Sequence, residues 1–290
     1  MFSLFKTKNK ASPETPLQPK NFIEKPSDFV DSRDCGLVDA VMGGWYQNDS
    51  NELFKGFQIN SSDIVIDVGC GAGGATLFSA RRGAHVIFTD TDANKVASLK
   101  ILVAETPARK SEAIVSDSMP LPISSGTGTR IICLEVLEHV EKPNELLKEL
   151  YRIGAPGALY FLSIPDPAGE MLQKQVAPAA HFKTPNHINI FTREEFSNLI
   201  AEAGFQIEGK HYYGFYWTMW MLFYWLSSDA EGKTFDDATH DQIIPPYPEI
   251  NNDWAKLWHT VLRMPNGKKL RDSLDEILPK SQIIIARKPG

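Results

Sequence analysis

The sequence has little of what marks several classes of protein. Its 290 residues include only three cysteines, too few for a disulfide framework, which favours a reducing compartment such as the cytoplasm. Acidic residues outnumber basic ones, 36 to 30, so no overall basic field exists to hold nucleic acid. No apolar run reaches 18 residues, which argues against an ordinary transmembrane helix. Lysines soon interrupt the apolar start of the chain, unlike a secretory signal.

What is present is typical of a globular protein. Hydrophobic residues make up 42% and charged residues 23% of the chain, and the length suits one large domain or a domain with an insertion. Residues 1–28 are rich in lysine, proline, serine and asparagine, and we expect a flexible leader there. Phe2, Leu4 and Phe5, followed by lysines, leave a weak membrane contact as the alternative.

Strand and helix signals alternate from residue 63 onward. The predicted strands are 63–68, 85–89, 112–116, 130–134, 158–164 and 205–209. The predicted helices are 75–82, 93–104, 143–153 and one that begins after the capping residue Thr192 and ends at Gly204. This alternation predicts an α/β fold of the doubly wound, Rossmann-like type, with a mostly parallel sheet.

The last part of the chain departs from this alternation. A further strand is predicted at 281–287. The segment that precedes it is too long to be a loop without secondary structure. This stretch, 211–280, opens with nine aromatic side chains within 14 positions and holds helical patterns near 254–262 and 270–278. Three interpretations of the aromatic run stay open: a helix buried against the sheet, a lid over an apolar acceptor, or a surface at a membrane interface.

A glycine-rich loop follows the first predicted strand. Gly69, Gly71 and Gly74 lie between a strand and a helix, where a backbone approaches a ligand closely. Asp90 ends the next strand, at the place of a ribose-binding acid, so a nicotinamide dinucleotide would also fit. Asp67 sits in an apolar strand end and needs a cationic or donor-rich partner. The sulfonium and ammonium of S-adenosylmethionine (SAM) would supply such a partner, whereas a pyrophosphate would not.

Two further segments support SAM. After the third predicted strand, Asp117 could accept a hydrogen bond from an adenine amino group, with Met119 and its apolar neighbours against the ring. After the fourth, Glu135, Glu138 and His139 stand at i, i+3 and i+4. If the chain turns helically there, two carboxylates and an imidazole point to one side.

Taken in order, these motifs resemble the class I SAM-dependent methyltransferases. The D-x-G-x-G-x-G loop, the acid after strand two, the S-D-x-x-x-L-P stretch, E-V-L-E-H-V and a Pro-Gly turn all match between residues 62 and 209. The resemblance implies a seven-stranded sheet whose antiparallel last strand lies beside strand five. It implies a core at 29–210 with an amino-terminal helical cover, an aromatic helical insertion at 211–280 between strands six and seven, and the last core strand at 281–290. It implies cofactor-binding roles for Asp67, Gly69, Cys70, Gly71, Gly73, Asp90, Thr91, Asp117, Ser118, Met119 and Glu135.

The resemblance extends to a metal site. E-x-x-E-H with a histidine five residues before a helix cap is similar to the ubiquinone-pathway catechol O-methyltransferases and the small-RNA 2′-O-methyltransferases. It implies Mg²⁺ or another divalent cation on Glu135, Glu138, His139 and His187. Two alternatives stay open: His139 or His187 acts as a metal-free general base, or Glu138 and His139 are structural. Three other histidines are expected to be structural or solvated: His181, His211 and His240.

The sequence therefore predicts a SAM-dependent methyltransferase that methylates an oxygen of a small, hydrophobic or lipid-linked acceptor. Residues 211–280 carry seven basic and ten acidic side chains, which argues against RNA as the acceptor. Two alternatives remain: an NAD(P)-dependent oxidoreductase that uses the same glycine loop, and a non-catalytic, membrane-associated module with a methyltransferase fold. We expect a cytoplasmic location, with peripheral membrane contact as an option, and make no prediction of oligomeric state.

Overall fold

The computed structural model of the chain describes residues 32–117, 119–236 and 238–290. The predicted leader at 1–28, with its alternative of a membrane contact, lies outside the described residues, as does the predicted cofactor residue Ser118. All three cysteines are buried and free, in keeping with the absence of a disulfide framework.

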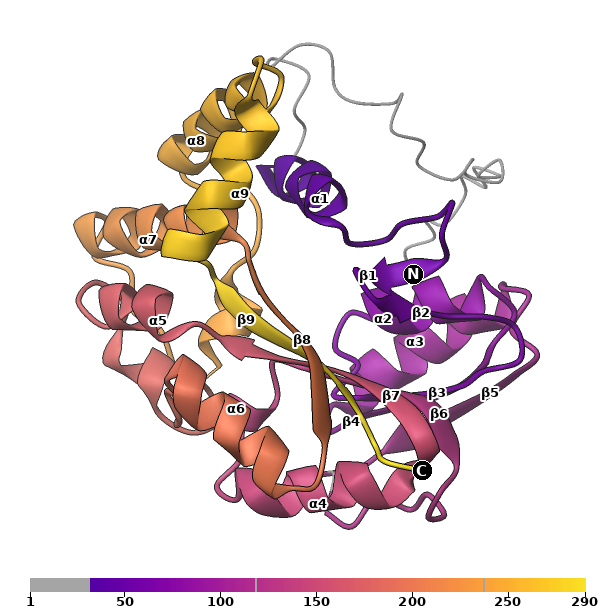
Figure 1. Cartoon of the computed structure of the whole chain (residues 1–290). Helices are drawn as coiled ribbons and strands as arrows, with labels where there is room; N and C mark the ends of the chain where they lie inside the picture. Colours follow the sequence, from indigo (N-terminus) through magenta and orange to yellow (C-terminus); the bar gives the residue numbers. More distant parts are fainter. Residues whose placement is uncertain (1–31, 118, 237) are drawn as a thin grey trace, which may run out of the picture.

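A seven-stranded sheet in the order β5-β4-β3-β6-β7-β9-β8 forms the centre (Figure 1). Neighbouring strands are parallel from β5 to β7, whereas β9 runs antiparallel to both β7 and β8. The predicted doubly wound sheet with an antiparallel last strand beside strand five is confirmed. The strands are β3 (Ile64–Val68), β4 (His85–Asp90), β5 (Lys110–Val115), β6 (Gly128–Leu134), β7 (Gly154–Pro165), β8 (Gln206–Tyr213) and β9 (Ser281–Arg287).

Helices cover both faces of the sheet (Figure 1). They are α2 (Gly74–Ala80) and α3 (Ala93–Ala104) on one face, and α4 (Pro143–Ile153) and α6 (Arg193–Glu202) on the other. Successive side chains of β3 are buried on opposite faces of the sheet. Val65 shares one buried cluster with Leu99 of α3, and Ile66 shares a second cluster with Leu146 of α4. Burial on both faces explains why the central strands read as nearly continuous apolar runs.

Among the described residues, a helix and a hairpin precede the sheet in the sequence. A helix, α1 (Ser32–Gly43), is followed by a small hairpin of β1 (Glu52–Phe54) and β2 (Phe57–Gln58). Phe54 stacks on Phe161 of β7, with ring centroids 5.4 Å apart, so the hairpin covers part of the sheet. The short elements near the carboxyl edge are the 3₁₀ turn η3 (Leu137–His139), the helix α5 (Pro167–Gln173), and the 3₁₀ turns η4 (Ala179–Phe182) and η5 (Thr239–Gln242).

The described residues between β8 and β9 include the α-helices α7 (Phe215–Ala230), α8 (Glu249–Leu262) and α9 (Gly267–Ile277), in agreement with the predicted helical insertion. Most of the aromatic run is buried. Trp220 Nε1 donates to Ser32 Oγ (2.8 Å), and Trp258 shares the same buried cluster. The buried members of the run form a third core with α1 and α8. They are therefore buried, as the first interpretation expects, but against other helices and not against the sheet.

The boundary of the sixth strand differs from the prediction. The strand continues to Tyr213, past the predicted end at Gly209, so the first residues of the predicted insertion belong to the sheet. Tyr213 pairs with Ser281, the first residue of β9, and the partner strand thus sets the length of β8. Within the described part of the chain, no helix has both the length and the apolar character needed to cross a membrane.

Candidate active site

The candidate site lies at the carboxyl ends of the parallel strands. Parallel strands all end at one edge of the sheet, and ligands of such folds bind outside that edge. The loop after β3 carries the glycines, β4 ends in Asp90, and Glu135 follows β6. Most of the predicted site residues that the structure describes lie on the loops or strand ends at this edge. Asp67 lies within β3, and a loop after α5 brings His187 to the same edge.

The glycine loop has the backbone that its sequence requires. Gly69, Gly71 and Gly73 have φ angles of +74°, +50° and +83°, which favour glycine. A Cβ on Gly69 would lie 2.4 Å from a methyl group of Val136, whereas one on Gly71 would meet no atom within 4 Å. Close packing thus demands the first glycine, and the second faces open space where a ligand has room.

Asp90 holds this loop in place. Its Oδ2 accepts a hydrogen bond from the Gly71 amide (2.9 Å), and its Oδ1 accepts one from the Asp92 amide (3.0 Å). A carboxylate has about four lone-pair positions, so capacity remains for ribose hydroxyls. The exposed Thr91 follows directly. At the end of β5, Asp117 Oδ1 accepts from the Met119 amide (3.3 Å), which fixes the turn proposed for adenine.

Asp67 and Cys70 are buried beside the loop. Asp67 Oδ2 accepts a hydrogen bond from the Thr76 hydroxyl (2.6 Å). Burial raises the pKa of Asp67 to about 6, against the opposing effect of the Thr76 hydrogen bonds. Burial likewise raises the pKa of the Cys70 thiol to about 12, so this thiol stays neutral and is a poor nucleophile.

Glu135 is engaged by a residue that we did not predict. Its Oε2 lies 2.6 Å from Lys280 Nζ, and its Oε1 accepts from the Ser163 hydroxyl (2.9 Å). Burial opposes ionisation of Glu135, but the charge and hydrogen bond of Lys280 outweigh it and hold the pKa of Glu135 below its usual range. Lys280 stands 145 residues away in the sequence, and no local signal points to this pairing.

Glu138 is the most unusual acid of the site. It is 1% exposed, and neither of its carboxylate oxygens has a hydrogen-bond partner among the described residues. Burial, and then the neighbouring charge of Glu135, raise the pKa of Glu138 well above its ordinary value. Its Oε1 lies 3.7 Å from His139 Nε2, too far for a hydrogen bond. Such a carboxylate is costly to bury unless a ligand satisfies it.

His139 and His187 meet beside Glu138. The expected turn after β6 forms as the 3₁₀ turn η3, and the amides of Ile188 and Asn189 both donate to the Glu138 carbonyl oxygen (2.9 and 3.1 Å). One ligand atom from each of Glu138, His139 and His187 lies within 4.8 Å of the others. Three of the four predicted metal-binding residues therefore come together, while Glu135 is paired with Lys280.

Two histidines that were expected to be structural or solvated join this site. Ligand atoms of His181, His187 and His240 also lie within 4.8 Å of one another, so His181 and His240 are not isolated; His181 is buried and His240 is exposed. His181 comes from η4 and His240 from η5, and only the fold brings them together. Burial lowers the pKa of His181 to about 2 and that of His187 to about 3, so both imidazoles are neutral. His211 lies elsewhere, with its ring against Phe54.

A cavity of about 240 Å³ is lined by most of these residues, although not by Glu138. Its lining includes Glu135, His139, Glu170, His181, His187, His240 and Lys280, together with Met221 of α7. Residues of the insertion thus form one wall, and residues of the methyltransferase-like core form the other. The cavity therefore brings imidazoles, carboxylates and one lysine together at the carboxyl edge of the sheet.

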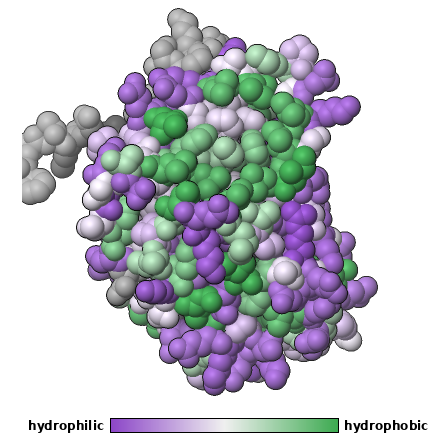
Figure 2. Space-filling view, turned by 90° about the vertical axis from the view of Figure 1, so that its left-hand side faces the viewer, coloured by the Kyte–Doolittle hydropathy of each residue, from purple (hydrophilic) through white to green (hydrophobic). Residues whose placement is uncertain are grey.

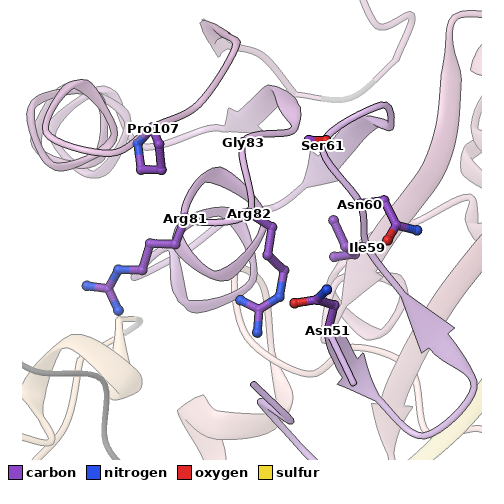
Figure 3. A pocket seen from close by; sticks show the side chains of 8 residues that line it. All are labelled: Asn51, Ile59, Asn60, Ser61, Arg81, Arg82, Gly83 and Pro107. Atoms are coloured by element: carbon purple, nitrogen blue, oxygen red, sulfur yellow. The ribbon is translucent and has the colours of Figure 1, made fainter. Parts of the chain in front are cut away.

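A larger cavity of about 430 Å³ lies at the opposite edge, near the amino ends of β3 and β4 (Figure 3). It is lined by Asn51, Arg81, Arg82 and other residues. The Arg82 guanidinium stacks on the Phe78 ring and donates to the Phe78 carbonyl oxygen (3.0 Å). Arg82 is therefore held by contacts within its own helix region. The larger cavity is lined by none of the acids or histidines described above.

A family comparison agrees with the fold and the site. Residues 47–209, more than half of the chain, match the model of a family described as a methyltransferase domain. The chain belongs to this family. It is a SAM-dependent methyltransferase of class I, which confirms the class, the enzyme type and the organic cofactor predicted from the sequence.

Curated relatives with sequence similarity include ubiquinone biosynthesis O-methyltransferases. The protein of Albidiferax ferrireducens is 26% identical over 177 residues, which cover 57% of this chain and 68% of that protein. The protein of Pseudomonas paraeruginosa is 30% identical over 146 residues, which cover 46% of this chain and 63% of that protein. For other such relatives the match spans less than half of their length, for example 43% in Dechloromonas aromatica.

Solved structures share the fold. A geranyl diphosphate C-methyltransferase from Streptomyces coelicolor, in complex with Mg²⁺, geranyl diphosphate and S-adenosyl-L-homocysteine, has a TM-score of 0.51. It is 17% identical, and the match covers 80% of this chain and 75% of that chain. At this identity the similarity establishes the fold alone.

Proposed function

We propose that this protein transfers the methyl group of SAM to a hydroxyl oxygen of a small, apolar acceptor. The observation that carries the proposal is the group of Glu138, His139 and His187, of which Glu138 and His187 are buried and His139 is half-buried, at the same sheet edge as the glycine loop. Methyl transfer from a sulfonium is an in-line displacement, so a hydroxyl acceptor needs alignment and a group that takes its proton. The names of the ubiquinone biosynthesis O-methyltransferases support oxygen as the acceptor atom.

The cofactor is proposed to lie along the edge from β3 to β5. The methionine part would lie near Asp67 and Gly69, and the ribose would pair with Asp90. The adenine would lie near Asp117 and Met119. Open space at Gly71 and the remaining capacity of the Asp90 carboxylate support this placement. The proposed surroundings of the cofactor also include Cys70, Gly73 and Thr91. Glu135 would lie beside the cofactor because it directly follows β6.

The residues of the site fit a divalent cation. Glu138 presents two buried carboxylate oxygens without a partner among the described residues, and a cation would satisfy them. Glu138, His139 and His187 would hold it, while Glu135 is occupied by Lys280. When bound, such a cation lowers the pKa of a coordinated hydroxyl and orients it.

His139 as a metal-free base is favoured by a separate observation. Its Nδ1 lies 2.9 Å from the carbonyl oxygen of Pro185, which can only accept a hydrogen bond. Nδ1 therefore carries the hydrogen in the neutral ring, and Nε2, which lies 3.7 Å from Glu138 Oε1, keeps the lone pair. That lone pair could take the proton of an acceptor hydroxyl.

The test measures methyl transfer and SAM binding separately. Radiolabelled SAM is incubated with a panel of small hydroxylated aromatics, with protein that has been chelated and with protein supplied with Mg²⁺. The Glu138→Gln variant should lose transfer while its SAM affinity in calorimetry stays unchanged. The exposed Glu141→Gln variant is the matched control. Full transfer by Glu138→Gln, or binding of NAD in place of SAM, would overturn the proposal.

A lipid surface is the proposed source of the acceptor. Figure 2 shows an apolar area on the face where α7 and α8 lie, and α8 presents apolar side chains at helical spacing. The apolar side chains of these two helices that are more than two fifths exposed include Leu226 of α7 and Ile250 and Leu257 of α8. Zwitterionic vesicles should retain the wild type in flotation assays and lose the double variant Ile250→Glu, Leu257→Glu. The control is Ile101→Glu on α3, and equal flotation of all three proteins would refute this source.

A further inference from the structure

One nitrogen in the cavity has no partner in the described structure. His181 is 1% exposed, and its Nδ1 lies 3.2 Å from the Thr239 hydroxyl. The opposite ring nitrogen, Nε2, is buried without any hydrogen bond. An unsatisfied buried polar atom costs about 1–3 kcal/mol, so a site that retains one usually holds something that pairs with it.

The neighbouring histidine is held in a different way. His187 Nδ1 lies 2.8 Å from Glu170 Oε2, and its Nε2 lies 3.4 Å from Nε2 of His240. A ring nitrogen that is hydrogen-bonded to a carboxylate leaves the other nitrogen oriented for a metal, and this arrangement is common around zinc. Glu170 is 2% exposed, so it is well placed to fix the ring of His187.

The spacing of the nitrogens suits a tetrahedral ion. Two imidazole nitrogens bound at about 2.0–2.1 Å to one tetrahedral zinc ion are separated by about 3.3–3.4 Å. The distance of 3.4 Å between Nε2 of His187 and Nε2 of His240 equals this nitrogen-to-nitrogen separation. The ligand atom of His181 lies within 4.8 Å of both, so a small movement of one ring would complete the third corner.

We infer that His181, His187 and His240 form a binding site for one transition-metal ion of the Zn²⁺ class. Imidazole ligands suit Zn²⁺, Co²⁺ or Ni²⁺ better than Mg²⁺, which prefers oxygen. A hydrogen bond between His187 and His240 would still leave His181 Nε2 without a partner, whereas an ion uses all three nitrogens. Three protein ligands leave a fourth position free.

This site differs from the E-x-x-E-H group and goes beyond the proposed function. His187 has a single ring nitrogen left after its contact with Glu170, so the two groups cannot hold separate ions through it. An ion on the three histidines takes that nitrogen, so it replaces the cation proposed above on Glu138, His139 and His187. Glu138 and His139 then contact the acceptor directly, with His139 as the metal-free base. Because His240 belongs to the segment between α7 and α8, the ion would also tie the insertion to the core.

The experiment measures metal binding without reference to methyl transfer. Full-length protein is purified without a metal-affinity tag, and its metals are counted by mass spectrometry. Chelated protein is then titrated with Zn²⁺ in the presence of millimolar Mg²⁺, and with Co²⁺ while visible absorption is recorded. We expect one equivalent of Zn²⁺ that Mg²⁺ does not displace, and a Co²⁺ spectrum typical of four-coordinate nitrogen ligands.

Variants distinguish the two groups of ligands. His181→Ala and His240→Ala should each weaken Zn²⁺ binding at least 100-fold, while Glu138→Gln and His139→Ala stay within threefold of the wild type. His211→Ala serves as the control histidine, and circular dichroism verifies that each variant is folded. Absence of Zn²⁺ binding in the wild type, or loss of binding in Glu138→Gln and His139→Ala in place of the His181 and His240 variants, would overturn the inference.

Discussion

Lys280 pairs with Glu135 across the sheet, with 2.6 Å between Nζ and Oε2. The lysine directly precedes β9, the glutamate directly follows β6, and β7 lies between these strands. The backbone of Lys280 also bridges its neighbours: its amide donates to the Tyr213 carbonyl oxygen (2.9 Å), and its carbonyl oxygen accepts from the Asp166 amide (2.8 Å). The last strand of the chain therefore completes the site.

Removal of this lysine should destabilise the fold moderately. Lys280→Met leaves Glu135 with one hydroxyl as its polar side-chain partner, and we expect a loss of about 1–2 kcal/mol in the free energy of unfolding. The figure is below that of a fully buried pair because the two side chains are 33% and 28% exposed. Urea denaturation of chelated protein gives the value.

A double-mutant cycle with Glu135→Gln tests whether the pair itself is responsible. Once the carboxylate is absent, Lys280→Met should cost much less than it does in the wild type, which gives a coupling of about 1 kcal/mol or more. Lys280→Arg, which keeps the charge, is the control. Additive losses would show that Lys280 stabilises the edge through some other contact.

Asp90→Ala should weaken SAM binding by at least tenfold. The change removes the proposed ribose contact and also frees the Gly71 amide, so the glycine loop loses its anchor. Asp92→Ala in the same turn is a matched control, because Asp92 caps α3 and should cost about 1 kcal/mol of stability without changing SAM affinity. Calorimetric titration compares the two variants, and equal SAM affinity for both would exclude Asp90 as the ribose ligand.

The sequence contained enough to predict the sheet, because buried parallel strands and amphipathic helices leave strong local patterns. The glycine loop and Asp90 were also recognisable, since their roles depend on neighbouring residues. The length of β8 could not be predicted, because the last residues of β8 pair with residues of β9, which lie some 70 residues further along the chain.

The polar interior of the site was harder to predict for a similar reason. His181 and His240 carry no local pattern, and their proximity to His187 follows from the packing of the insertion against the loop after α5. Lys280 lies at the end of a helical insertion and acquires its partner only when β9 enters the sheet. Contacts of this kind are set by tertiary structure, which one sequence without relatives does not reveal.

Asp67 should make stability fall as the pH rises from about 4 to 6. Its pKa is raised to about 6 in the fold from an ordinary 3.8, so the folded protein keeps a proton that the unfolded chain releases in this range. A shift of about two units corresponds to roughly 3 kcal/mol. In SAM-free protein, Asp67→Asn should therefore be up to about 3 kcal/mol more stable than the wild type at pH 8 and about equal to it at pH 4.

Urea denaturation across this pH range measures the difference between the two proteins. The Thr76 hydroxyl can still donate to the amide oxygen of the asparagine, so packing is preserved. Asp49→Asn, at an exposed position, should show no comparable trend. A stability gain that is the same at pH 4 and pH 8 would contradict a raised pKa as its cause.

Arg271 links the amino-terminal helix to the insertion, and its removal should be the most damaging single change outside the sheet. Its Nε lies 3.2 Å from Asp39 Oδ1 in α1, and its Nη2 lies 2.8 Å from Asp275 Oδ2. Asp39 is fully buried, and Asp275 accepts from the amides of Gly214 and Phe215 at the start of α7. Arg271→Met leaves two buried carboxylates without their cation, which should cost about 3–5 kcal/mol.

The neighbouring pair of Lys268 and Asp272 provides the contrast. Its atoms are as close, at 2.6 Å, but both side chains are more than two fifths exposed, so Lys268→Met should cost less than about 1 kcal/mol. If the loss in Arg271→Met comes from unpaired charge, the added change Asp39→Asn should restore part of it, although Trp258 Nε1 still needs an acceptor there. Equal, small losses in Arg271→Met and Lys268→Met would mean that α1 and the insertion are held together by their shared aromatic core, and that the buried charges contribute little.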